Sequence, residues 1–63
     1  MPEHARKVLI IDDDPQFLLT LGAYLEDSGF IVIRANDGQE GVEQFALHRP
    51  DIVVTDLRMP RLD

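Results

Sequence analysis

The sequence predicts an α/β fold in which short apolar strands alternate with amphipathic helices. Three short runs of mostly apolar residues occur at 7–11, 30–35 and 51–56. The two stretches between them carry apolar residues at helical spacing. Strands and helices that alternate in this way form a parallel sheet with right-handed crossovers, so the expected order is β-α-β-α-β.

The three apolar runs have the composition of strands that are buried in a parallel sheet. "KVLII" at 7–11 and "DIVVTD" at 51–56 are rich in β-branched residues and too short to be helices. "FIVIRA" at 30–35 stays apolar until Arg34. The continuous apolar run at 7–11 indicates a strand that is covered on both faces.

The first helix is predicted over about residues 15–28. Asp14 is a favourable N-cap, and Pro15 suits the first helical position because its missing N–H would have no helical partner there. Gly22 lowers the helix propensity, so close packing against a neighbour is expected at that point. Gly29 fits the left-handed position that follows a helix.

The second helix is predicted to begin after Asp37 and to end near Arg49. Asp37 followed by Glu40 resembles a capping box with Asp in place of Ser or Thr. Pro50 then stops the helix. The apolar stripe of this helix consists of Val42, Phe45 and Ala46.

Length and charge limit the function classes. The chain has 63 residues, a net charge of −6, a pI of about 4.6 and no cysteine, so one domain without disulfides or thiolate metal sites is expected. The acidic balance argues against nucleic acid as a partner of this segment. No apolar run approaches the ~20 residues of a membrane span, and residues 1–6 read as a polar tail, so a cytoplasmic protein without a membrane partner is expected.

Carboxylates follow two of the predicted strands. Asp12 and Asp13 come directly after the first strand, and Asp56 ends the third. Ligands of parallel α/β sheets bind outside the carboxyl ends of the strands. If these strands are neighbours, the three carboxylates meet, and Mg²⁺ would offset their repulsion. The simpler interpretation of Asp12 and Asp13 is that they are turn carboxylates stabilised by a helix N-terminus.

Three segments carry a resemblance to a known family. "LIIDDD", "DIVVTDLRMP" and "ANDGQEGVEQF" resemble, in order and spacing, the receiver domain of the response regulators of two-component signalling. The resemblance covers essentially all of residues 7–63. Each motif is weak alone, but the set at this spacing is specific.

The resemblance implies roles for individual residues. Asp56 would be the phospho-acceptor, and its phosphoryl group would come from a histidine kinase or a phosphotransfer protein. Asp12, Asp13 and Asp56 would bind Mg²⁺, together with the backbone carbonyl of Arg58. A receiver domain assists its own phosphorylation and is not a conventional turnover enzyme.

The resemblance also implies a flavodoxin-like, doubly wound parallel sheet. A complete receiver has five strands in the order 2-1-3-4-5, so residues 7–63 correspond to a partial domain with the order 2-1-3. The family's hydroxyl residue after strand four and lysine after strand five have no counterpart here, so an incomplete or inactive module is expected. The third strand would be an exposed edge, which predicts a homodimer through that edge. The alternative is that the sequence is a piece of a longer chain.

Two other functions fit parts of the sequence. One is a non-enzymatic, self-associating α/β module that retains a vestigial acidic pocket. The other is a Mg²⁺-dependent phosphatase that uses carboxylates two positions apart, as Asp12 and Asp14 are. Pro15 and the start of a helix argue against the phosphatase.

Overall fold

The predicted architecture is confirmed. The computed structural model describes residues 5–55, which form β1 (Lys7–Ile11), α1 (Pro15–Asp27), β2 (Ile31–Ala35), α2 (Gly38–His48) and β3 (Ile52–Thr55). The three strands make one parallel sheet in the order β2-β1-β3. This is the order 2-1-3 expected for a partial flavodoxin-like sheet. Neither helix in this part of the chain is long and apolar enough to cross a membrane.

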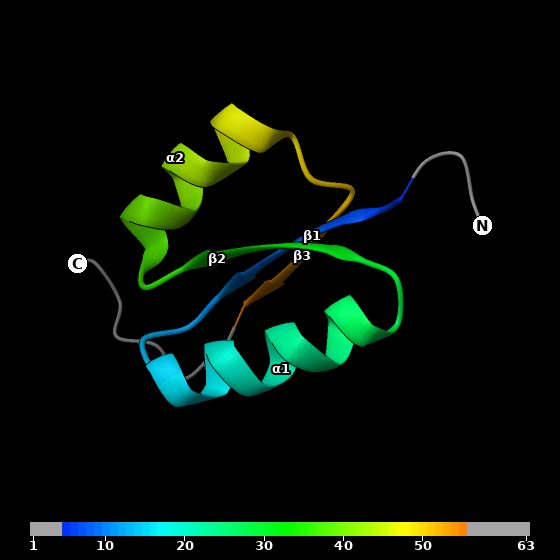
Figure 1. Cartoon of the computed structure of the whole chain (residues 1–63). Helices are drawn as coiled ribbons and strands as arrows, with labels where there is room; N and C mark the ends of the chain where they lie inside the picture. The colour runs from blue at the N-terminus through cyan, green and yellow to red at the C-terminus, as the bar shows by residue number, and fades with distance from the viewer. Residues whose placement is uncertain (1–4, 56–63) are drawn as a thin grey trace.

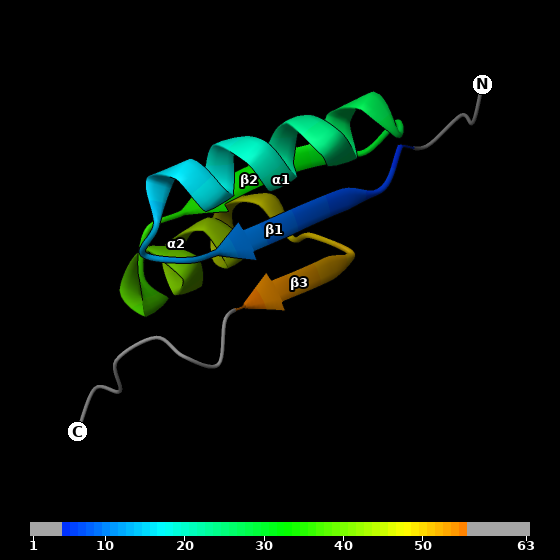
Figure 2. The same ribbon diagram turned by 90° about the horizontal axis from the view of Figure 1, so that it is seen from below.

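β1 is the central strand and is covered on both faces. Leu9 is paired with Ile33 of β2 on one side and with Val53 of β3 on the other. The two helices lie on opposite faces of the sheet, α1 on one and α2 on the other (Figure 1). In the view from below, β3 lies at the edge of the sheet beside β1 (Figure 2). The double cover explains why the first strand is apolar along almost its whole length.

The best-filled part of the core lies between the sheet and α1. Val8 and Ile10 of β1 are buried with Leu18 of α1. The partly buried side chains that pack against this group are Leu21, Leu25, Phe30 and Val32. Residues 18, 21 and 25 recur at helical spacing, so one face of α1 supplies the helical side of this core.

The ends of α1 follow the predicted chemistry. Asp14 is the N-cap, and Gly29 has a φ of 97°, which is unfavourable for other residues. The N–H of Gly29 donates to the carbonyl of Glu26, and the N–H of Phe30 donates to the carbonyl of Leu25. These two bonds form a Schellman motif. The helix ends at Asp27, one residue before the predicted end.

Gly22 lies against a close neighbour, as its position in the helix predicted. The guanidinium group of Arg34 from β2 occupies the space that a Cβ at position 22 would need. Arg34 Nε donates to the carbonyl of Leu18 at 3.2 Å, and Nη1 lies 3.6 Å from a carboxylate oxygen of Glu26. The close neighbour that requires a glycine at position 22 is therefore Arg34, a charged residue of β2.

α2 begins with a variant of the predicted capping box. Asp37 accepts a hydrogen bond from the N–H of Glu40 at 2.8 Å, but the Glu40 carboxylate accepts from the N–H of Asn36, one residue before the cap. Gly41 packs against Ile11, whose Cδ1 would lie 2.5 Å from a Cβ at position 41. This close approach brings α2 onto the sheet near the end of β1.

The apolar stripe of α2 and the whole of β3 are only partly covered by the described residues. Val42 is 70% exposed, and the exposed fractions of Ile52, Val53 and Val54 lie between 38% and 43%. The sequence predicted that the third strand would be an exposed edge of the partial sheet. Within residues 5–55 nothing packs beyond β3, so this expectation is met there.

Candidate functional site

Asp12 stands at the carboxyl end of the central strand and is buried. It follows Ile11, the last residue of β1, and its N–H donates to the carbonyl of Ala35 at the end of β2 at 3.1 Å. The residue is only 1% exposed. A carboxylate is costly to bury unless hydrogen bonds or a cation stabilise its charge, so this position is unusual for an ordinary turn residue.

The next two aspartates have different surroundings. Asp13 is exposed. Asp14 is also exposed, and its Oδ1 accepts a hydrogen bond from the N–H of Gln16 at 3.0 Å. The N–H of Asp14 itself donates to Asp12 Oδ1 at 2.9 Å. The structure thus confirms Asp14 as a helix cap and connects that cap to the buried carboxylate.

The strand pairing brings the end of β3 beside the end of β1. Thr55 is the last described residue of β3 and is paired with Ile11, the residue before Asp12. The predicted phospho-acceptor Asp56 and the predicted carbonyl ligand Arg58 lie outside the described residues. Among residues 5–55, no group of three or more His, Cys, Asp or Glu side chains could hold a metal ion. Asp12, Asp13, Asp56 and Arg58 therefore remain predicted ligands.

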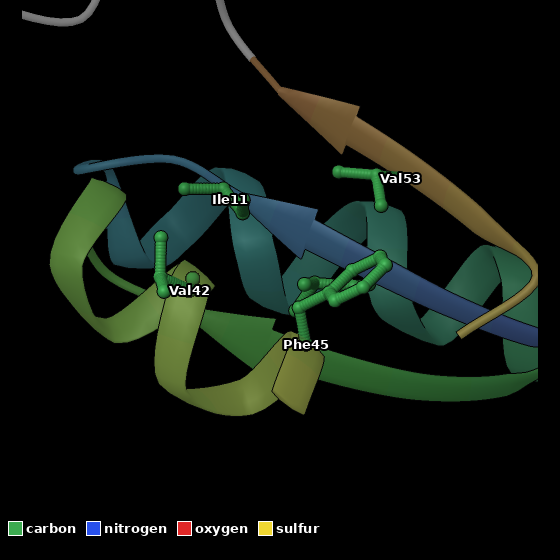
Figure 3. A pocket seen from close by; sticks show the side chains of 6 residues that line it. Ile11, Val42, Phe45 and Val53 are labelled. Atoms are coloured by element: carbon green, nitrogen blue, oxygen red, sulfur yellow. The ribbon is translucent and has the colours of Figure 1, made fainter. Parts of the chain in front are cut away.

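A second feature of the molecule is an apolar groove on the α2 face of the sheet. Its volume is about 210 Å³, and it lies between α2 and the strands β1 and β3 (Figure 3). It is lined by Leu9, Ile11, Gly41, Val42, Phe45 and Val53. The apolar stripe of the second helix is the sequence signal for this groove, but the groove itself does not follow from the sequence pattern alone. The groove carries no polar group suited to phosphoryl chemistry, so it is separate from the carboxylate site.

Comparison with known proteins decides the family. Residues 8–63 match the family model of the response regulator receiver domain. The chain belongs to the receiver domain family of response regulators. The resemblance found in the sequence motifs is thereby confirmed, and with it the broad role of the family as the phospho-accepting module of two-component signalling.

Several curated transcriptional regulatory proteins contain a segment similar to this receiver chain. The transcriptional regulatory protein PdtaR of Mycobacterium tuberculosis is 46% identical over 59 residues, which cover 92% of this chain and 29% of PdtaR. The alkaline phosphatase synthesis transcriptional regulatory protein PhoP of Bacillus subtilis is 38% identical over 58 residues, or 92% of this chain and 24% of PhoP.

A receiver-like segment also occurs in a relative named as an enzyme. A protein-glutamate methylesterase/protein-glutamine glutaminase of Oleidesulfovibrio alaskensis is 42% identical over 59 residues, or 90% of this chain and 16% of that protein. The receiver chain thus spans less than a third of each of these relatives.

Proposed function

We propose that this chain is the phospho-accepting part of a two-component phosphorelay and that Asp56 receives the phosphoryl group. The donor is the phosphohistidine of a histidine kinase or of a phosphotransfer protein. The observation that carries the proposal is the receiver-family match over residues 8–63, which includes Asp56. The structure supports it by placing the buried Asp12 directly after β1, where Ile11 is paired with Thr55.

The proposed reaction is a phosphoryl transfer from nitrogen to oxygen. A carboxylate oxygen of Asp56 attacks phosphorus, the P–O bond forms, and the P–N bond to the donor imidazole breaks. The imidazole nitrogen keeps the bonding electron pair and takes up a proton. The product is an acyl phosphate on Asp56. The chain is consumed as the acceptor in each cycle, so it is not a conventional turnover enzyme.

Mg²⁺ is the proposed cofactor. The residues that would hold it are Asp12, Asp13 and Asp56 with the backbone carbonyl of Arg58, all of which offer hard oxygen ligands. The buried position of Asp12 fits this role because a neighbouring cation lowers the cost of burying a carboxylate. When bound, the ion offsets negative charge on the phosphoryl group and on the acceptor carboxylate. We further propose a cytoplasmic location for the chain and no nucleic acid or membrane contact within this segment.

The proposal is tested by labelling with a small phosphodonor, such as acetyl phosphate, in the presence of Mg²⁺. The 63-residue chain and a version extended to the length of a complete receiver domain are compared. The extended chain is expected to gain one acid-labile, hydroxylamine-sensitive phosphoryl group on Asp56, detected by intact-mass spectrometry. The short chain is expected to be labelled far less because it lacks the family's lysine and hydroxyl residues.

Two variants control this experiment. Asp56→Asn removes the nucleophile and is expected to abolish labelling. Asp51→Asn changes an exposed aspartate before β3, whose carboxylate accepts from the N–H of Lys7 at 2.8 Å, and should leave labelling unchanged. Undiminished labelling of the extended Asp56→Asn variant would refute the assignment of the acceptor.

Self-association is a second candidate function, favoured by the exposed edge of the sheet. β3 is paired on one side only by the described residues, and its three apolar side chains are exposed. We propose that two copies of the 63-residue chain pair along β3 into a six-stranded sheet with two-fold symmetry. In a chain that continues with further strands, those strands would cover β3 instead, and the acidic pocket would serve phosphotransfer.

A further inference from the structure

We propose that Asp14 is a positioning residue for Asp12, and that it acts through the cap of α1 and not through its charge. The inference rests on the proposed function, because Asp12 is one of the carboxylates that would hold Mg²⁺. It goes beyond that function by assigning a task to the third aspartate of the "DDD" motif.

The first step of the argument is that α1 fixes the backbone of Asp14. Its Oδ1 accepts from the N–H of Gln16 at 3.0 Å, and its carbonyl accepts from the N–H of Leu18 at 3.1 Å. Pro15 follows with its restricted φ, and Asp14 has extended φ and ψ of −98° and 107°. These constraints leave the N–H of Asp14 with one direction relative to the helix.

The second step is that this N–H points at Asp12. It donates to Asp12 Oδ1 at 2.9 Å, and hydrogen bonds to an ionised carboxylate are stronger than neutral ones. The backbone of Asp12 is held from the other side, because its N–H donates to the carbonyl of Ala35 in β2. The buried carboxylate is therefore fixed between a strand and a helix N-terminus. Partners that orient a metal ligand commonly affect metal affinity.

The alternative is that Asp14 supplies only negative charge near the pocket. The two roles are separable because Asn is as good an N-cap as Asp and carries no charge. Asp14→Asn keeps the cap and the orientation of the backbone N–H, whereas Asp14→Ala loses the cap. Asp37→Ala is a matched control, since Asp37 caps the other helix, α2, by accepting from the N–H of Glu40 in the same way.

The experiment measures Mg²⁺ affinity by amide NMR titration. It uses the chain extended to the length of a complete receiver domain, with and without each of these three substitutions. Asp14→Ala is expected to weaken Mg²⁺ binding about tenfold, as removal of an orienting partner does. Asp14→Asn and Asp37→Ala are expected to stay within about twofold of the unsubstituted chain. Equal weakening by Asp14→Ala and Asp14→Asn would show a charge effect and overturn the proposal, as would unchanged binding by Asp14→Ala.

A metal-free measurement separates this inference from the proposed function. Relative to the intrinsic rate of each residue type, hydrogen exchange at the amide of residue 14 is expected to be several-fold faster in Asp14→Ala than in Asp14→Asn, whether or not Mg²⁺ binds. Equal exchange in the two variants would overturn the positioning role. If the unsubstituted chain failed to bind Mg²⁺ at millimolar concentration, the proposed magnesium site would fall. The exchange result would then still decide whether the cap of α1 holds Asp12.

Discussion

Arg34 shows how one polar residue can define a position on a neighbouring helix. It lies in β2, yet its guanidinium group covers Gly22 of α1 and its Nε donates to the carbonyl of Leu18. The side chain is 32% exposed, so part of it stays in contact with water. The pair explains why a helix with strong apolar spacing tolerates a glycine in its middle.

This pairing predicts an unusual result for Gly22→Ala. In an isolated helix this substitution should stabilise the helix by up to about 1 kcal/mol. Here the new methyl group displaces Arg34, and the lost hydrogen bond costs about 1.5–3 kcal/mol before allowance for exposure. We expect a net loss of about 1 kcal/mol in the free energy of unfolding, measured by urea denaturation of the chain extended to receiver length.

The same substitution should change sign when Arg34 is absent. In an Arg34→Ala background, the three atoms nearest to a Cβ at position 22 are gone, and Gly22→Ala should raise the free energy of unfolding by up to about 1 kcal/mol. An equal loss in both backgrounds would contradict the packing explanation.

At the scale of the element, the two ends of α1 are set by different chemistry. The start depends on the Asp14 carboxylate, and the end depends on a backbone conformation at Gly29 that side chains rarely adopt. Gly29→Ala should therefore lower the free energy of unfolding by about 1 kcal/mol or more, because the φ of 97° is strained for alanine.

Gly38 provides the matched control for this prediction. It is the first residue of α2, has no positive φ, and has open space where a Cβ would be placed. Gly38→Ala should leave the free energy of unfolding unchanged or raise it slightly, again measured by urea denaturation. A similar loss for both substitutions would show that the backbone of Gly29 is not the cause.

The boundaries of the elements were largely predictable from sequence because local signals determine them. Asp14, Asp37 and Gly29 mark helix ends through backbone hydrogen bonds with residues only a few positions away. The sequence did not predict that the Glu40 carboxylate would accept from the N–H of Asn36 and not from the N–H of Asp37. It depends on where the Glu40 side chain reaches once the β2–α2 turn is formed.

At the scale of the whole molecule, burial and surface shape were less predictable from the sequence where segments far apart in the chain pack together. The separation of Asp14 from its two neighbours followed from Pro15, but the burial of Asp12 and the exposure of Asp13 depend on the packing of β1. The groove beside Phe45 depends on the distance between α2 and β3, which no sequence pattern states. Residues 56–63 lie outside the described residues, so the complete carboxylate set stays a prediction.

The exposed edge of the sheet yields a prediction about assembly. Sedimentation of the 63-residue chain at micromolar concentration should show a dimer. Val54→Lys places a charge on the 38% exposed apolar surface of β3 and should shift the chain to monomer. Leu47→Lys makes the same change at a 71% exposed position on α2 and should leave the dimer intact. A compact, cooperatively unfolding monomer of the unsubstituted chain would refute pairing through β3.

The central place of β1 has a consequence for synthesis of the chain on the ribosome. β1 is made before both of its partners, because β2 and β3 come later in the sequence. At typical translation rates the most apolar strand stays unpaired for times on the order of seconds. Only α1 and β2, made soon afterwards, can shield Val8 and Ile10 in that interval. We expect chaperones to meet the β1–α1–β2 segment of the nascent chain before β3 is made.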